Sequence, residues 1–149
     1  MSIDPRGPRF AAALTAVLLA LTLLTSSFWL LAIQGALFAV GAFAGPGRSP
    51  YGLLYRHLVA PRLGPPHELE PVEPVRFAQG VGLVFALAGL VGYASGLPLL
   101  GAVATGGALA AAFLNAAFGL CLGCEVYLLF RRATPRRVPV GGTPSETAA

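Results

Sequence analysis

Two cysteines separated by two residues are the side chains best suited to chemistry in this sequence. Cys121 and Cys124 are its only cysteines, and Glu125 follows them directly. Residues three apart share one face of a helix, and a disulfide needs its two Cα atoms within about 7 Å, so the spacing allows a bridge. If a helix begins after Gly119, then Cys121 lies at its N-terminus, where the helix dipole favours the thiolate.

The pair predicts thiol–disulfide redox chemistry or sulfur relay, with Cys121 as the attacking thiolate and Cys124 as the resolving thiol. Glu125 would tune protonation, either by accepting a proton from a thiol or by opposing the thiolate with its like charge. The alternative is that both cysteines are small apolar packing residues, in a non-enzymatic membrane scaffold or partner subunit. No thioredoxin-like strand pattern surrounds the pair, so the sequence does not favour either interpretation.

Other kinds of site have less support in the sequence. His57 and His67 are expected on the same side of the molecule as the cysteines, but their spacing matches no zinc-ligand pattern. The chain also has no recognisable phosphate-binding loop, catalytic triad or paired-carboxylate arrangement for general acid–base catalysis. We therefore predict neither a metal site nor a cofactor.

The composition is that of a membrane protein. Of the 149 residues, 56% are hydrophobic and 11% are charged, against about 25% charged residues in ordinary soluble domains. The mean hydropathy is +0.74. Every basic residue is an arginine, and the arginines lie between apolar runs instead of forming a basic patch with interleaved aromatics, so nucleic acid is not an expected partner.

The lengths of the apolar runs predict an all-α, polytopic fold with four transmembrane helices arranged as two hairpins. Residues 10–44 would make one helix of about 50 Å, against a hydrocarbon core of about 30 Å, so the chain must fold back at the polar cluster 25–27. A second turn is expected at 95–98. The predicted spans are 10–25, 28–44, 77–94 and 98–118, with an extension to 130, inside one membrane domain of residues 1–132.

The loop between the hairpins carries its own helix signal. Ser49 followed by Pro50 is typical of an N-cap and a first helical residue, and residues 51–59 mix leucines with Arg56 and His57. We expect a short amphipathic helix at the membrane interface there, and extended chain after it, because prolines recur at 61, 65, 66, 71 and 74. Residues 133–149 are expected to be a disordered cytoplasmic tail.

The arginines predict the orientation in the membrane. A four-span arrangement places all ten on one side, and positive charge marks the cytoplasmic side. Both chain ends and the central loop are therefore expected in the cytoplasm. The arginines lie before the first span, between the second and third spans, and after the fourth span: Arg6, Arg9, Arg48, Arg56, Arg62, Arg76, Arg131, Arg132, Arg136 and Arg137.

The two halves of the chain resemble each other. Residues 8–11 open the first hairpin as residues 76–78 open the second, which suggests a parallel repeat. The cysteines fall beyond the matched part, so we assign them to an appended element, at the inner interface and with a bend at Gly119. Gln34, Gln79 and Asn115 are expected to make hydrogen bonds between helices.

Three blocks of sequence carry a resemblance to a known family. They are residues 3–10, residues 76–79 with Gly82, and residues 115–127 around the cysteines. Together they resemble the bacterial membrane family called domain of unknown function 4395, over residues 3–132. Its members are small multi-span proteins often encoded near thioredoxin-like and sulfurtransferase proteins, and no activity is established for them. The resemblance implies a thiol or persulfide role in the bacterial plasma (inner) membrane, with such a protein as partner at the cytoplasmic face. A homo-oligomer is a further expectation.

Overall fold

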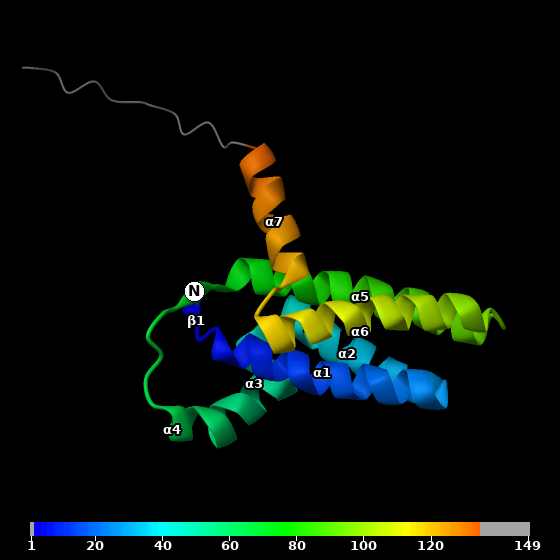
Figure 1. The fold of residues 1–149 in the computed structure, drawn as a ribbon, viewed down its shortest axis with the longest axis horizontal. Coiled ribbons are helices and arrows are strands. Elements are labelled where there is room, and N and C mark those ends of the chain that lie inside the picture. Colours follow the sequence, from blue (N-terminus) through cyan, green and yellow to red (C-terminus); the bar gives the residue numbers. More distant parts are fainter. Residues whose placement is uncertain (1, 135–149) are drawn as a thin grey trace, which may run out of the picture.

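The computed structural model describes residues 2–134, and these are almost entirely helical, as predicted. Residues 135–149, and with them most of the expected tail and two of its arginines, lie outside the described residues. Four helices run lengthwise beside one another (Figure 1): α1 (Arg6–Thr25), α2 (Phe28–Phe43), α5 (Val72–Ala94) and α6 (Pro98–Phe118). Three of them, α1, α5 and α6, are long and apolar enough to cross a membrane, whereas α2 is a shorter apolar helix.

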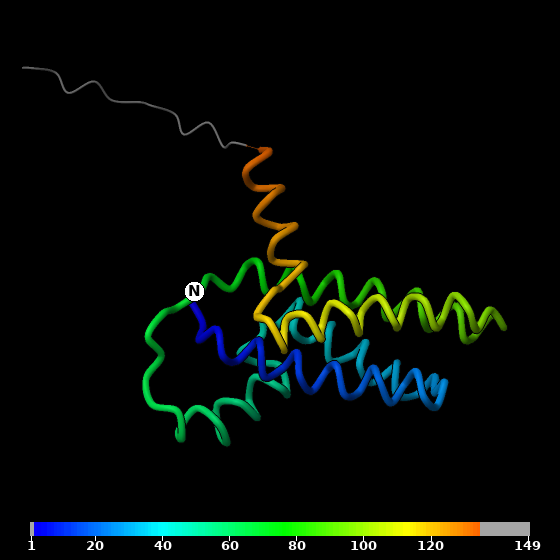
Figure 2. The backbone as a smooth tube through the Cα atoms, in the orientation of Figure 1, coloured from blue at the N-terminus to red at the C-terminus, as the bar shows by residue number. Residues whose placement is uncertain are grey.

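Both turns between consecutive helices lie at the same end of the bundle (Figure 2). In the first, Ser26 takes the left-handed conformation that ends α1, and the Ser27 hydroxyl accepts a hydrogen bond from the Leu30 backbone N–H. In the second, Pro98 is the first residue of α6, where its missing N–H costs nothing. The polar clusters at 25–27 and 95–98 were correctly predicted as turns.

Large side chains of α2 pack closely against glycines of α5 in the bundle core. The tightest packing joins α2 to α5 and α1 to α6, instead of α1 to α2. A Cβ atom at Gly82 would lie 2.8 Å from the ring of Phe38, and one at Gly89 would lie 2.7 Å from Leu31. The large apolar residues therefore fit into gaps that only glycine leaves.

One of the three predicted polar residues does link helices. The Gln34 side chain is fully buried; its amide donates to the Thr15 hydroxyl over 3.4 Å, and its carbonyl accepts from the Tyr51 hydroxyl over 2.9 Å. These bonds join α1, α2 and the central helical segment. The prediction of interhelical hydrogen bonds is confirmed for Gln34.

The central segment is a longer helix than expected. It consists of four consecutive elements: η1 (Pro46–Arg48), α3 (Pro50–Leu54), the π-helical η2 (Tyr55–Val59) and α4 (Ala60–Leu63). Ser49 caps α3 by accepting a hydrogen bond from the Gly52 N–H, as the sequence predicted. The prediction that Pro61 lies in extended chain is wrong, because Pro61 lies inside α4. Pro61 has no backbone N–H, so the carbonyl four residues earlier lacks its usual helical hydrogen bond. That carbonyl belongs to the π-helical turn η2.

Two helices begin earlier than the apolar runs suggested, at Arg6 and Val72. The chain before them forms a small strand pair, which the all-α prediction did not include: β1 (Ser2–Ile3) pairs antiparallel with β2 (Glu70–Pro71). Asp4 stabilises this region. Its carboxylate accepts hydrogen bonds from the Arg6 backbone and side chain and, over 2.8 Å, from the Tyr55 hydroxyl. Burial raises the pKa of Asp4, but these bonds outweigh it and hold the pKa below its usual value.

Candidate functional site

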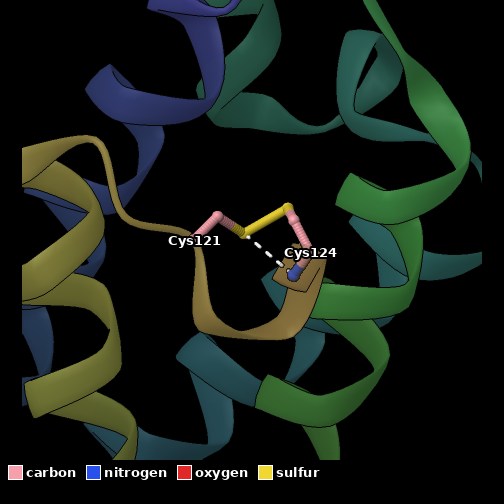
Figure 3. Close-up of a disulfide and its surroundings, with 2 residues drawn as sticks. All are labelled: Cys121 and Cys124. Atoms are coloured by element: carbon pink, nitrogen blue, oxygen red, sulfur yellow. Dashed lines mark hydrogen bonds between the residues drawn. A yellow bond between two sulfur atoms is a disulfide. The ribbon is translucent and has the colours of Figure 1, made fainter. Parts of the chain in front are cut away.

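The two cysteines form a disulfide at the start of a separate helix, α7 (Leu122–Ala133) (Figure 3). Their Cα atoms are 5.2 Å apart, within the range that a bridge requires. Cys121 is the N-cap of α7, and its Sγ accepts a hydrogen bond from the Cys124 backbone N–H over 3.4 Å. The expectation that a helix would begin after Gly119 with Cys121 at its N-terminus is confirmed.

Two glycines determine this local geometry. Gly119 ends α6 with a φ of 69°, a left-handed conformation that favours glycine, so α7 leaves the bundle at a steep angle (Figure 1). Gly123 allows the first turn of α7 to lie directly on α5, because a Cβ there would come within 2.6 Å of Ala78. The ring of Tyr127 packs beside that of Phe77 with centroids 5.6 Å apart. The pair is therefore held against α5 by close packing.

Of the other side chains considered for the site, Glu125 stays beside the cysteines, whereas the two histidines lie in other elements. Glu125 lies in the first turn of α7 with its side chain exposed, and its backbone N–H donates to the Cys121 carbonyl. His57 lies in the π-helical turn, and His67 lies in the loop that follows α4. Within residues 2–134, no three histidine, cysteine or acidic side chains are grouped closely enough to hold a metal ion.

A cavity of about 340 Å³ lies behind the disulfide and reaches into the bundle. Its inner part is bounded by buried Thr15, Phe38 and Ala108, and Cys121 and Cys124 both form part of its wall. Small residues make up most of the α6 side of the cavity, whereas the α5 side mixes small residues with larger ones such as Val81 and Phe85. The small lining residues of the two helices are Ala78, Gly82, Gly107, Ala108, Ala111 and Ala112.

Three polar side chains on this wall were not recognised as site residues from the sequence. Gln79 and Asn115 line the cavity, and among the described residues the structure records no hydrogen bond from either carboxamide. For these two, the predicted interhelical bond is therefore not observed. Arg9 also lines the cavity, and its only recorded hydrogen bond is a long one, 3.4 Å, to the Ala116 carbonyl. The sequence did contain one indication for Arg9 and Asn115. Both lie at helix ends that the predicted hairpins bring to the same end of the bundle.

Arg76 provides a comparison for Arg9, since the two occupy matching positions in the repeat that the sequence suggested. Arg76 donates two hydrogen bonds of 2.9 Å each, to the carbonyl oxygens of Ala42 and Phe43 at the end of α2. Its guanidinium is well satisfied by the protein. Arg9 reaches the end of α6 in the same manner but with one weak bond, and it is exposed at the edge of the cavity, so most of its donors are not satisfied by the described residues.

Fold and site together define a helical protein with three helices suited to crossing a membrane and a disulfide at the cap of a further helix. The chain belongs to the family described as domain of unknown function (DUF4395), whose model matches residues 3–132. No curated protein and no solved structure matches the chain.

Proposed function

We propose that this protein is a membrane-embedded thiol–disulfide exchange protein that acts through Cys121 and Cys124 at the cytoplasmic face. The observation that carries the proposal is that the bridged pair caps α7 at one end of the bundle and forms the wall of a cavity. A pair retained only for packing has no need of an adjoining cavity.

We place the protein in the bacterial plasma (inner) membrane with four spans, α1, α2, α5 and α6. The helix bounds support this arrangement, because the described arginines lie in the first turns of α1 and α5, between α2 and α5, or at the end of α7, and none lies in either turn between paired helices. Positive charge marks the cytoplasmic side. The 16 residues of α2 give about 24 Å of helix, which is short for a span and would require local thinning of the bilayer.

The orientation of α7 fits a helix at the membrane surface. It leaves the bundle steeply, and its apolar residues are exposed, with Leu129 60% and Phe130 63% accessible. Arg131 and Arg132 follow at its end. An apolar face next to arginines is typical of a helix that lies in the interface, which would keep the disulfide within reach of soluble proteins.

The chemistry follows from the cap position. In the reduced state the N-terminus of α7 would stabilise negative charge on Cys121. Its thiolate would attack a disulfide of a thioredoxin-like partner, form a mixed disulfide and release one partner thiolate. Cys124 would then attack Cys121 Sγ and release the second partner thiolate, so that two electrons and two protons pass to the partner. The reverse sequence oxidises the partner. Glu125, exposed beside the pair, would exchange the protons with water.

The sulfur-relay form of the proposal uses the same nucleophile. A sulfurtransferase persulfide would transfer its outer sulfur to the Cys121 thiolate, leaving a persulfide on Cys121 and a free thiolate on the donor. Mass spectrometry distinguishes the two forms, because a relay adds one sulfur atom to Cys121 whereas exchange adds none.

The test is the redox state of the pair in living cells. Cells are quenched in acid and alkylated with a maleimide that shifts the gel band, with and without prior reduction. We expect a partly oxidised pair whose oxidised share changes under oxidant or thiol stress. Cys121→Ser is the control that abolishes the bridge but keeps an N-cap oxygen for α7. If the pair stays fully reduced in every condition and mass spectrometry finds no added sulfur on Cys121, the proposal is overturned. The protein would then be a scaffold with structural cysteines.

A further inference from the structure

We infer that the cavity behind the disulfide binds a lipid-borne quinone, which accepts the two electrons that the cysteine pair takes from its partner. This inference rests on the proposed exchange function and names the second substrate of the same pair. The argument depends on the size of the cavity, its polar groups, its openings and the electron balance.

The size and lining favour an organic ring over an inorganic ion. A volume of about 340 Å³ is far larger than a single sulfide or sulfate requires, and it lies at the lower end of the range of small-molecule sites. Most of the wall is apolar, with Phe38 and Phe85 beside a row of glycines and alanines. Aromatic and small side chains together accommodate a flat ring, because the small residues leave a slot and the aromatic faces border it.

The polar groups on the wall include several hydrogen-bond donors. Arg9 offers only donors, and each carboxamide of Gln79 and Asn115 offers an amide N–H pair beside its carbonyl acceptor. The Gln79 carboxamide lies against Gly41 of α2, and Arg9 is exposed at the start of α1. The one acidic residue among the lining residues, Glu70, comes from β2 beside the N-terminal strand. These donors suit a ligand that carries carbonyl oxygens, and the Arg9 charge would stabilise the oxygen anion that forms on reduction.

Some residues on the cavity wall lie on the outer surface of the bundle, which would face lipid. Others lie near the end of the bundle that would face water. On the outer surface of the bundle, Phe85 of α5 and Gly107 of α6 line it and are exposed, and the Phe85 ring lies on Gly107. At the opposite end, Pro5 and Pro8 line it near the start of α1. A carrier dissolved in the bilayer would therefore enter between α5 and α6 by displacing the exposed Phe85 ring, while the soluble partner approaches the disulfide from the cytoplasm.

The electron balance requires such an acceptor. When a partner dithiol reduces the bridge, Cys121 and Cys124 become two thiols and the partner becomes a disulfide. The two thiols then pass two electrons and two protons to the quinone, which becomes a hydroquinone, and the Cys121–Cys124 bond forms again. The chain has only one cysteine pair, so the same two sulfurs must serve the partner and the quinone in alternation.

The experiment uses the full chain in lipid nanodiscs, reduced with dithiothreitol and freed of excess reductant without oxygen. A fully substituted, short-tailed benzoquinone is added, because its ring has no open position for thiol addition. We expect quinone absorbance to fall and the bridge to form in equal molar amounts. The Cys121→Ser, Cys124→Ser protein should bind the quinone without reducing it.

Cavity variants test whether the reaction takes place in this site. Ala112→Phe fills the cavity, whereas Ala110→Phe adds the same bulk to a separate apolar groove between α1 and α6. We expect quinone-dependent oxidation to be lost in the first and unchanged in the second, with exchange against a soluble dithiol protein intact in both. Should Ala112→Phe fail to fold, the Gln79→Leu, Asn115→Leu protein serves instead, with quinone binding about tenfold weaker, or about 1.4 kcal/mol.

The outcomes separate the two proposals. Exchange with the soluble protein but no oxidation by quinone would overturn the quinone site and leave the proposed function standing. The quinone site would also be overturned if neither Ala112→Phe nor the Gln79→Leu, Asn115→Leu protein slowed oxidation by the quinone. The reaction would then occur elsewhere. Absence of exchange with any soluble dithiol would overturn the proposed function itself.

Discussion

The helical segments that follow the two hairpins have the same construction, although the sequence suggested that only the second was an addition. Ser49 caps the first by accepting a hydrogen bond from the N–H three residues later, and Cys121 caps the second in the same way. Tyr55 packs on Phe10 with ring centroids 5.9 Å apart, as Tyr127 packs on Phe77. The cysteine helix therefore shares its cap and its aromatic contact with the central segment, which indicates that the repeat extends to both.

The two segments differ in the third residue after the cap. This residue is Gly52 in the first segment and Cys124 in the second. Gly52 lies directly against the Pro46 carbonyl. The first cap therefore has no room for a side chain at its fourth position, whereas the second cap opens onto the cavity. The comparison teaches that the same kind of cap can hold a cysteine pair only where the neighbouring packing leaves space.

Moving the cysteine pair into the first cap is the strongest test of this comparison. In a Cys121→Ser, Cys124→Ser background, Ser49→Cys with Gly52→Cys should form no bridge, because a Cβ at residue 52 would overlap the Pro46 carbonyl. We expect the free energy of unfolding to fall by about 3 kcal/mol, as for other overpacked sites. Denaturation in detergent and the maleimide gel shift measure both effects. A bridge formed at full stability would show that space does not distinguish the two caps.

The two arginines that close the helix ends give the second test. Arg76→Gln removes two 2.9 Å bonds and should cost about 2 kcal/mol of unfolding free energy. Arg9→Gln should cost less, but it should raise the pH midpoint of Cys121 alkylation in the reduced protein, because a cation that lines the same cavity as Cys121 is lost. Both variants keep the acidic residues Glu70, on the same cavity wall, and Glu125, on α7. These residues therefore do not account for a difference between the two midpoints. Equal midpoints in the two variants would contradict the distinct role of Arg9, and Arg9→Lys should restore the original midpoint.

A third and smaller effect concerns the first segment alone, since the recorded bond from Tyr55 to Asp4 ties it to the N-terminus. Asp4→Asn should lower the unfolding free energy by about 1 kcal/mol at neutral pH. The pKa of Asp4 is lowered in the folded protein, so its contribution is present above the unfolded pKa of about 3.9 and is lost as the pH falls through the folded value. Thermal unfolding against pH should show the two proteins converging in acid. A constant difference down to the lowest pH would exclude the charge of Asp4 as the cause.

Sequence reasoning succeeded where the signal is local. Ser27, Ser49 and Gly119 each act through their own backbone or their nearest neighbours, and each was placed correctly at a helix end. It failed for Pro61, whose tolerance inside a helix depends on a π-helical turn just before it. It could not predict the cavity either, because the many alanines and glycines of α6 look alike in sequence, and only the packing of α5 and α7 determines which of them border empty space.

The sparse contact between α1 and α2 has a consequence for biosynthesis. The first hairpin leaves the ribosome with Leu19, Leu31 and Phe38 but without the residues of α5 and α6 that pack against them. It is therefore only a loosely joined pair at that stage, since few of its native contacts exist yet. Assembly is completed by the second hairpin, which makes the late part of the chain, including the cysteines, the part whose arrival turns two hairpins into a folded protein.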